Sequence, residues 1–359
     1  MNKLLHVGLD VGSTTVKIVV MDETLNTIHR DYQRHFSDTR NTVCNVLEDL
    51  TEKYSDYTFT IALTGSGAMS AAKFLDLPFI QEVVSCKRAV EKYIPETDVV
   101  IELGGEDAKI IYFDKSIEQR MNGTCAGGTG AFIDQMASLL HTEPAGLNEL
   151  AKKHKMIYPI ASRCGVFAKT DVQPLLNEGA AKEDIAASIF QAVVNQTISG
   201  LACGRPIRGN VAFLGGPLNY LSELRQRFIE TLKLTPEQII VPDEAHLLVA
   251  KGAALDSINY NIVSVEKLKS KIGLLRASHD DTSVPLSPLF SIEDEYKEFK
   301  KRHSADTVEK GNLKSYKGDA FIGIDAGSTT TKLVLINNDG NLLYSLYGSN
   351  EGNPLQSVI

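Results

Sequence analysis

Three features are scarce in this sequence, and each scarcity excludes a class of protein. Lys and Arg number 37 against 45 Asp and Glu, so the net charge is -8 and no general basic surface is available for nucleic acid or an anionic membrane. A local basic patch and protein partners remain compatible with this charge. No apolar run approaches the ~20 residues that a membrane span needs, and the N-terminus reaches a Gly/Ser/Thr turn too early for a signal peptide.

Cysteine is the third scarce feature. The five cysteines are spread along the chain, and an odd number without close spacings does not make a disulfide framework. We therefore expect a reducing cytoplasm as the compartment. What the chain does have is length, because 359 residues with 43% hydrophobic content can bury a large core in about two or three domains.

A repeated segment gives the first positive information about organisation. The motif Gly8-Leu-Asp-Val-Gly-Ser-Thr-Thr-Val-Lys17 returns as Gly323-Ile-Asp-Ala-Gly-Ser-Thr-Thr-Thr-Lys332, and in both copies an alternating apolar strand and a turn follow. We expect 321–359 to be the truncated start of a second module like the one that begins the chain, so that the chain is a fragment of a longer tandem protein. A chance duplication of a β-hairpin is the alternative.

The chain before residue 259 alternates short apolar runs with helical patterns, which predicts an α/β architecture with covered sheets. The clearest helix is Glu183–Ala202, whose wide apolar stripe is typical of a buried packing helix. A second helix is predicted from Gly130 to about Leu140. From 259 to 320 the chain becomes richer in charge, and we expect a connector of helices and loops. The predicted strands are His6–Asp10, Val16–Met21, Phe59–Thr64, Asp98–Leu103, Ala108–Phe113 and Val211–Leu214.

Glycine-rich turns are the main candidates for chemistry. No Walker A sequence is present, because the nearest approach, Gly123-Thr-Cys-Ala-Gly-Gly128-Thr, lacks the lysine that reaches the phosphates. Three other turns each follow a short apolar strand: Asp10–Thr15, Leu103–Asp107 and Phe213–Pro217. Glycine lets backbone amides approach phosphate closely, and Ser and Thr hydroxyls add donors. One such turn is more often an ordinary hairpin, but three in order predict a phosphate site.

The order and spacing of these turns resemble the phosphate-1, phosphate-2 and adenosine motifs of the actin/Hsp70/hexokinase superfamily. The resemblance implies a two-lobed actin/Hsp70/sugar-kinase-like (ribonuclease H-like) ATPase fold, with lobe I in 1–95 plus 244–258 and lobe II in 96–243. It also implies that Asp10 positions a magnesium-bound water and that Asp107 faces the metal and the γ-phosphate. The residues implied to bind ATP are Gly12, Ser13, Thr14, Thr15, Gly104, Gly105, Glu106, Gly215 and Gly216.

Two charged residues beside these turns each allow two interpretations. Lys17 lies on the strand that leaves the first turn, where it either binds phosphate or points to solvent, as strand lysines usually do. Glu102 stands where much of the superfamily has Asp, which leaves its part in metal binding open.

Two cysteine-bearing loops indicate the branch of the superfamily. Met121–Met136 and Ile160–Val172, together with Gly104-Gly-Glu-Asp-Ala-Lys109, resemble the BadF/BadG/BcrA/BcrD ATPase family, whose best-known member activates 2-hydroxyacyl-CoA dehydratases. In that family a homodimer holds one [4Fe-4S] cluster with two cysteines from each subunit, and the matching positions are Cys125 and Cys164. Two identical cysteine pairs suit a cluster on a two-fold axis, and a helix N-terminus follows the first of them to face the anionic cluster.

The resemblance implies an ATP-dependent reductive activase that uses ATP, Mg2+ and the cluster to pass a low-potential electron to a partner iron-sulfur enzyme. A ferredoxin or flavodoxin would donate the electron, and neither nucleic acid nor a membrane is expected as a partner. A small-molecule kinase of the same fold shares the phosphate turns but leaves Cys125 and Cys164 unexplained. A nucleotide-gated binding module without a cluster is the third alternative.

The remaining cysteines and the histidines show no pattern of their own. Cys44, Cys86 and Cys203 match no ligand position, and zinc is disfavoured because no Cys-x-x-Cys pair is present. The eight histidines form no arrangement suited to metal binding or nucleophilic catalysis. We expect all of these residues to be structural.

Overall fold

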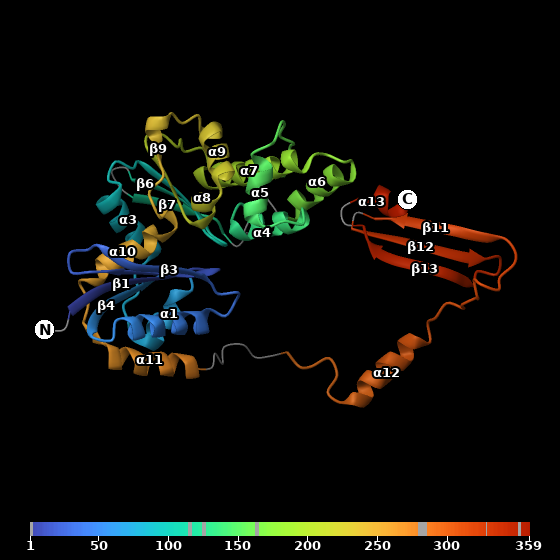
Figure 1. Cartoon of the computed structure of the whole chain (residues 1–359), viewed down its shortest axis with the longest axis horizontal. Helices are drawn as coiled ribbons and strands as arrows, with labels where there is room; N and C mark the ends of the chain where they lie inside the picture. The colour runs from blue at the N-terminus through green and yellow to red at the C-terminus, as the bar shows by residue number, and fades with distance from the viewer. Residues whose placement is uncertain are drawn as a thin grey trace. The chain divides into compact units, whose positions relative to one another are not determined.

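The computed structural model describes residues 3–113, 117–123, 127–161, 165–278, 286–327, 329–350 and 353–359. The chain divides into two compact units, one formed by Met1–Asp171 and Ala181–Ser278 and the other by Val172–Ala180 and His279–Ile359 (Figure 1). Two five-stranded sheets lie in the first unit, and a three-stranded sheet lies in the second.

The first sheet has the strand order β10-β4-β1-β2-β3. Its central strand is β1 (Lys3–Val11), which pairs antiparallel with β2 (Thr15–Met21) and parallel with β4 (Tyr57–Thr64). The edges are β3 (Thr27–Arg34) and β10 (Val263–Ser264). The three inner strands confirm the prediction and are slightly longer than expected, whereas β3 was missed because it is mostly polar.

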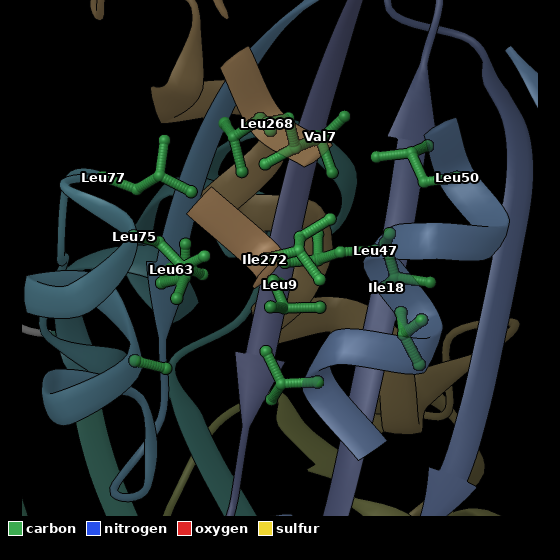
Figure 2. Close-up of a cluster of buried hydrophobic side chains, with 14 of the residues drawn as sticks. Val7, Leu9, Ile18, Leu47, Leu50, Leu63, Leu75, Leu77, Leu268 and Ile272 are labelled. Carbon is green, nitrogen blue, oxygen red and sulfur yellow. The ribbon is translucent and has the colours of Figure 1, made fainter. Parts of the chain in front are cut away.

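One face of the first sheet is covered by α1 (Thr39–Lys53), α2 (Ala68–Leu75) and α11 (Val265–Ala277). Alternate residues of the strands point to this face and form one core with the helices. Figure 2 shows this core, in which Val7 and Leu9 of β1 face the helices. The sheet is therefore held on this side by apolar burial from segments far apart in the sequence.

The segment expected to connect two modules begins as part of the first unit. Leu268 and Ile272 of α11 are fully buried in the core of the first sheet, and Ser264 caps the N-terminus of α11 with its side chain. The first compact unit therefore runs to Ser278, beyond residue 259.

The opposite face of the first sheet packs against α10 (Leu248–Ser257). Gly8 of β1 allows this approach, because a Cβ atom there would lie 2.0 Å from the carbonyl oxygen of Ala250. α10 also packs beside α3 (Glu82–Tyr93), and the side chains of both helices form a core with the second sheet. These two helices therefore lie between the two sheets.

The second sheet has the strand order β7-β6-β5-β8-β9. β5 (Val99–Leu103) pairs antiparallel with β6 (Ala108–Phe113) and parallel with β8 (Val211–Leu214). The edges are β7 (Ile117–Met121) and β9 (Ile239–Ile240). The three inner strands were predicted and are confirmed. The two edge strands were not, because β7 is largely polar and β9 is very short.

A long apolar helix organises the helical part of this unit. α7 (Lys182–Thr197) continues as a π-helical turn, Ile198–Ala202, so the predicted helix is confirmed with an altered end. Among the described residues, one helical stretch, Lys182–Ala202, is long and apolar enough to cross a membrane. No such stretch was predicted from the sequence. However, 67% of its apolar window is buried inside the protein. It is a core helix. The other helices here are α4 (Gly130–Leu139), α5 (Pro144–Ala151), α8 (Gly216–Tyr220) and α9 (Ser222–Leu232), with 3-10 turns at Pro236–Gln238 and Ala245–Leu247. The helix α6 (Gly165–Asn177) begins in the first unit and ends in the second.

The second unit contains the repeated hairpin. β11 (Ala320–Ala326) pairs antiparallel with β12 (Thr330–Asn337), which pairs with β13 (Leu342–Ser349). Two helices accompany the sheet, α12 (Glu293–Ser304) and α13 (Pro354–Val358). All seven residues of β11 are exposed.

Candidate nucleotide site

The three glycine-rich turns meet at one cavity of the first unit. Residues 14–15 after β1, 104–105 after β5 and 215–216 after β8 all line this cavity, whose empty volume is about 490 Å³. The turns are far apart in the sequence, but the strands that precede them end at the same place. The fold therefore brings residues of all three turns together at this cavity.

The first and second turns touch across the cavity. A Cβ atom at Gly105 would lie 2.1 Å from Oγ1 of Thr14, and the N–H of Glu106 donates a hydrogen bond to Oγ of Ser13 at 3.1 Å. Within the first turn, the N–H of Gly12 donates to a carbonyl oxygen at 2.9 Å and closes a tight hairpin. Backbone amides and hydroxyls of both turns therefore converge on a small volume.

The second and third turns depend on backbone geometry. Gly215 has a φ of +86°, and a Cβ atom there would lie 2.0 Å from the carbonyl oxygen of Leu103. In the second turn, the N–H of Gly104 donates to the carbonyl oxygen of Asp107 at 2.7 Å. Asp107 therefore closes its turn through the backbone, and it is not among the described residues that line the cavity.

Asp10 and Lys17 form a buried ion pair behind the first turn. Nζ of Lys17 lies 2.7 Å from Oδ2 of Asp10, and the two side chains are 14% and 4% exposed. Burial raises the pKa of Asp10, against the effect of the lysine. Burial alone would lower the pKa of Lys17, but the carboxylate of Asp10 raises it above its ordinary value. Lys17 is therefore a charged group on the cavity wall, and the alternative that it points to solvent is wrong.

A second buried ion pair joins the ends of β5 and β6. Glu102 and Lys109 are cross-strand partners, and 3.8 Å separates Nζ of Lys109 from Oε1 of Glu102. Lys109 also pairs with Glu82 at the start of α3. Burial alone would lower the pKa of Lys109, but the two carboxylates raise it, so the lysine is charged. Burial raises the pKa of Glu102 against the effect of this lysine.

The groups around the cavity fit a nucleotide with its divalent cation. Glycine-rich turns allow close approach of phosphate, and Lys17 supplies a positive charge. Oε2 of Glu102 is buried and has no hydrogen-bond partner among the described residues. An unpartnered buried carboxylate oxygen is costly, and a metal ion, a metal-bound water or a reactive water would satisfy it. Mg2+ prefers such oxygen ligands together with phosphate.

A second hollow, of about 540 Å³, adjoins the cavity on the side of the third turn. Apolar and aromatic side chains such as Ile133, Tyr220 and Leu221 make up much of its lining. This surface suits the flat, largely apolar face of adenine. The residues that border both hollows are Tyr32, Arg34, Gly130, Gly216 and Pro217.

Several cavity residues were missed in the sequence. The ring of Tyr32 on β3 contacts the rings of Tyr220 and His246, with centroid distances of 6.0 and 5.2 Å, and Arg34 pairs with Asp134 at 2.8 Å. His246 was expected to be structural, yet it lines the cavity. Burial, and then nearby positive charge, lowers its pKa, so its ring is neutral at pH 7. No motif marks these residues, because separate elements supply them.

The two expected cluster ligands, Cys125 and Cys164, lie outside the described residues. The residues that flank them nevertheless border one small cavity of about 170 Å³. In the parts of the chain that the structure describes, no group of three or more His, Cys, Asp or Glu is placed to hold a metal ion. The described flanking positions are Gly127, Gly128, Ala161 and Gly165, and they meet Phe132, Ala192 and Gln196.

The other cysteines differ in exposure. Cys44 and Cys86 are buried thiols, as expected of structural residues, and burial raises the pKa of both. Cys203 is an exposed free thiol after the π-helical turn. It therefore does not pack in a core.

Most of the chain that forms this site matches a known protein family. Residues 7–256 match the BadF/BadG/BcrA/BcrD ATPase family. The 2-hydroxyisocaproyl-CoA dehydratase activator of Clostridioides difficile is 31% identical over 272 residues, which cover 73% of this chain and 98% of that protein. The (R)-2-hydroxyglutaryl-CoA dehydratase activating ATPase of Acidaminococcus fermentans is 33% identical over 215 residues, 58% of this chain and 81% of that protein.

Two solved structures share the fold. The crystal structure of the Acidaminococcus fermentans (R)-2-hydroxyglutaryl-CoA dehydratase component A has a TM-score of 0.62 and 28% identity, covering 74% of this chain and 99% of that one. The activator of the 2-hydroxyisocaproyl-CoA dehydratase from Clostridium difficile, with bound ADPNP, has a TM-score of 0.60 and 26% identity, covering 78% and 100%.

The fold and the site together define an ATPase of the two-lobed actin/Hsp70/sugar-kinase type. Within that class, the chain belongs to the BadF/BadG/BcrA/BcrD ATPase family, as the resemblance of its motifs predicted.

Proposed function

We propose that this protein is an ATP-dependent reductive activase, which couples ATP hydrolysis to electron transfer from a [4Fe-4S] cluster to a partner iron-sulfur enzyme such as a 2-hydroxyacyl-CoA dehydratase. One observation carries the proposal: the second phosphate turn is bonded to the helix that follows Cys125. At the start of α4, the N–H of Gly130 donates to the carbonyl oxygen of Gly104 at 2.9 Å. The next residue, Ala131, donates likewise to Gly105 at 2.7 Å. A shift of this turn would therefore move α4.

The same hydrogen bonds change one expectation. The sequence suggested that the N-terminus of α4 faces the cluster with its free amides, whereas the first two amides are bonded to the second turn. The helix start is thus a mechanical link to the nucleotide site. In the proposal, nucleotide reaches the cluster environment through this link, and solvent exposure and amide contacts around a cluster help set its potential.

At the nucleotide site, residues 12–15 and 104–106 would wrap the phosphates, and residues 215–216 would approach the adenosine. Asp10 would position a metal-bound water, and Asp107 would face the metal and the γ-phosphate. Mg2+ bound with ATP would neutralise charge on the transferred phosphoryl group. Lys17, fixed by its ion pair, adds positive charge at the cavity wall.

At the cluster, Cys125 and Cys164 from each of two identical chains would supply four thiolates on a two-fold axis. The flanks of both loops border one small cavity, which supports a common site. Relatives named as dehydratase activators support a role in activating a dehydratase. A relative from Thauera aromatica that is named as part of a benzoyl-CoA reductase, 27% identical over 194 residues, supports a role beside a reductase. A ferredoxin or flavodoxin donor and a cytoplasmic location would suit such an activase.

Two alternatives remain distinct in their chemistry. A small-molecule kinase would transfer the γ-phosphate to an acceptor, and ATP turnover would then depend on that acceptor. A nucleotide-gated binding module would bind ATP without iron. The matched activators, one covered over 98% of its length, favour the activase.

Iron content tests the proposal. Anaerobically reconstituted wild type should hold about four iron ions per dimer, and Cys125→Ser should lose the iron and weaken the dimer while ATP binding persists. Cys203→Ser, which changes an exposed cysteine, is the matched control and should keep the iron. No iron in reconstituted wild type, or about four in Cys125→Ser, would refute electron transfer and leave the ATPase.

A further inference from the structure

Two opposite charges are buried side by side next to the nucleotide cavity. Glu102 and Lys109 are only 8% and 4% exposed, and they face each other across neighbouring strands of the second sheet. Buried charges are costly unless they are paired and hydrogen-bonded. The pairing explains why the lysine tolerates burial, but it uses only one oxygen of Glu102.

Lys109 is held from a second direction by Glu82. This carboxylate lies in the first turn of α3, one of the two helices between the sheets, and its Oε2 pairs with Nζ of Lys109. Its other oxygen, Oε1, accepts a hydrogen bond from the N–H of Ser66 at 3.2 Å. Ser66 follows β4 of the first sheet, so Glu82 connects the loop of one sheet to the lysine of the other.

The unpartnered oxygen of Glu102 indicates that a ligand binds beside it. Oε2 is buried and has no partner among the described residues, and Glu102 lines the cavity together with Thr14, Lys17 and Gly105. Asp107 does not share this lining. Among the described residues, Glu102 is therefore the carboxylate of the second sheet that borders the space where the first and second glycine-rich turns meet.

We propose that Glu102 holds the water that attacks the terminal phosphate of ATP, and that Lys109, clamped by Glu82, is the positioning residue that fixes the direction of this carboxylate. The water oxygen forms a bond to the γ-phosphorus while the bond from this phosphorus to the β,γ-bridging oxygen breaks. The bonding electron pair leaves with ADP. Glu102 accepts one proton from the water and releases it to inorganic phosphate or solvent.

This clamp makes hydrolysis depend on both sheets at once. Lys109 lies on β6, Glu82 lies at the start of α3, and Ser66 belongs to the loop after β4. If the start of α3 moves away from β6, Lys109 loses one of its two anions and Glu102 loses its fixed partner. The carboxylate of Glu102 is thus held in its direction only while the start of α3 lies against β6, as in the structure.

Kinetics of four variants test the clamp. Glu102→Gln and Lys109→Gln should each lower kcat for ATP hydrolysis by on the order of tenfold to a hundredfold, while KM and the Kd for ATP change by less than about threefold, because neither side chain is needed to bind the nucleotide. Lys109→Arg should recover most of the lost kcat. Glu82→Gln combined with Lys109→Gln should be no slower than Lys109→Gln alone, since the two residues act as one unit.

Arg88→Gln is the matched control. It removes an ion pair of α3 with Asp256, at 3.2 Å, on the same helix but away from the cavity, and should leave kcat unchanged. If Lys109→Gln fails to fold, Glu82→Gln, whose side chain is partly exposed, should still lower kcat at an unchanged Tm. Unchanged kcat in Lys109→Gln or in a folded Glu82→Gln, equal losses of kcat and ATP affinity, or no recovery with arginine would overturn the clamp.

The clamp, formed by Lys109 with Glu82 and Glu102, rests on the ATP hydrolysis of the proposed function but not on the cluster. Iron content therefore distinguishes failure of the clamp from failure of the proposed electron transfer. Wild type without iron would refute electron transfer and leave the kinetic pattern of the clamp standing. Full iron content together with unchanged kcat in Lys109→Gln would refute the clamp alone.

Discussion

The first strands of the chain and the strands of the second unit carry the same motif in the same register, but in different surroundings. Asp10 is opposite Lys17 in the first hairpin, and Asp325 is opposite Lys332 in the second. Both pairs form an ion pair, at 2.7 and 2.9 Å. The side chain of Asp10 is 4% exposed, however, and that of Asp325 is 69% exposed. The motif therefore specifies the hairpin and its ion pair, not a buried site.

The surroundings explain the difference. β1 has β4 on its second edge and α10 against its face, whereas β11 pairs only with β12 among the described strands. At Gly8 an added Cβ atom would overlap the backbone of α10, but at Gly323 the nearest atom would be a side-chain carbon at 3.3 Å. A nucleotide site needs the second and third turns as well, and the described part of the second unit contains no equivalent of them.

The largest contrast we expect is in nucleotide binding. The first hairpin contributes to a cavity formed by three turns, and the second hairpin stands without the other two, so the chain should bind one Mg-ATP and not two. Isothermal titration calorimetry on the whole chain measures this stoichiometry directly. Two nucleotides per chain would show that the hairpin alone suffices and would break the comparison.

Stability should show the next largest contrast. Leu9 and Ile324 occupy the same place in the two motifs, but Leu9 is 0% exposed and Ile324 is 48% exposed. Leu9→Ala should lower the free energy of unfolding of the first unit by about 2–5 kcal/mol, because it leaves a cavity in the core. Ile324→Ala should stay within about 0.5 kcal/mol. Chemical denaturation of both variants measures this, and equal losses would mean that β11 is buried in solution.

The third and smallest contrast that we expect is between the two Asp–Lys ion pairs, and it should appear in the rate of ATP hydrolysis. Asp10→Asn should slow ATP hydrolysis by about a hundredfold, because it removes the carboxylate that we propose to position metal and water and keeps the side-chain shape. The equivalent change, Asp325→Asn, should leave hydrolysis unchanged, since its ion pair is exposed. Steady-state ATPase rates of the two variants, measured side by side, decide this. A slow Asp325→Asn would assign the second copy a part in catalysis.

Prediction from sequence succeeded where a local pattern carries the information. Apolar strands that end in glycine-rich turns marked β1, β5 and β8, and these strands do bring the turns together. The polar edge strand β3 has no such pattern, so Tyr32 and Arg34 could not be placed at the site. Their position depends on which sheet edge faces the third turn, and pairing between strands determines that.

The burial of charged side chains could not be predicted from the sequence for the same reason. Lys17 and Lys109 both lie on strands, where a lysine usually reaches solvent, and the sequence alone could not decide whether Lys17 faces phosphate or solvent. Their burial follows from carboxylates that the fold supplies, Asp10 for the first and Glu82 and Glu102 for the second. His246 was likewise unmarked, because its cavity partners come from β3 and α8.

The open edge of β11 has a consequence for how copies of this chain meet one another. A seven-residue exposed strand with Phe321, Ile322 and Ile324 at its surface is a template for pairing with a neighbouring molecule. Association through this edge would rise with protein concentration and fall when charge is introduced along the strand. Association through the cysteine loops would instead follow iron content. If the proposed cluster forms, the chain would therefore have two routes to a dimer, and only the route through the cysteine loops would respond to oxygen and chelators.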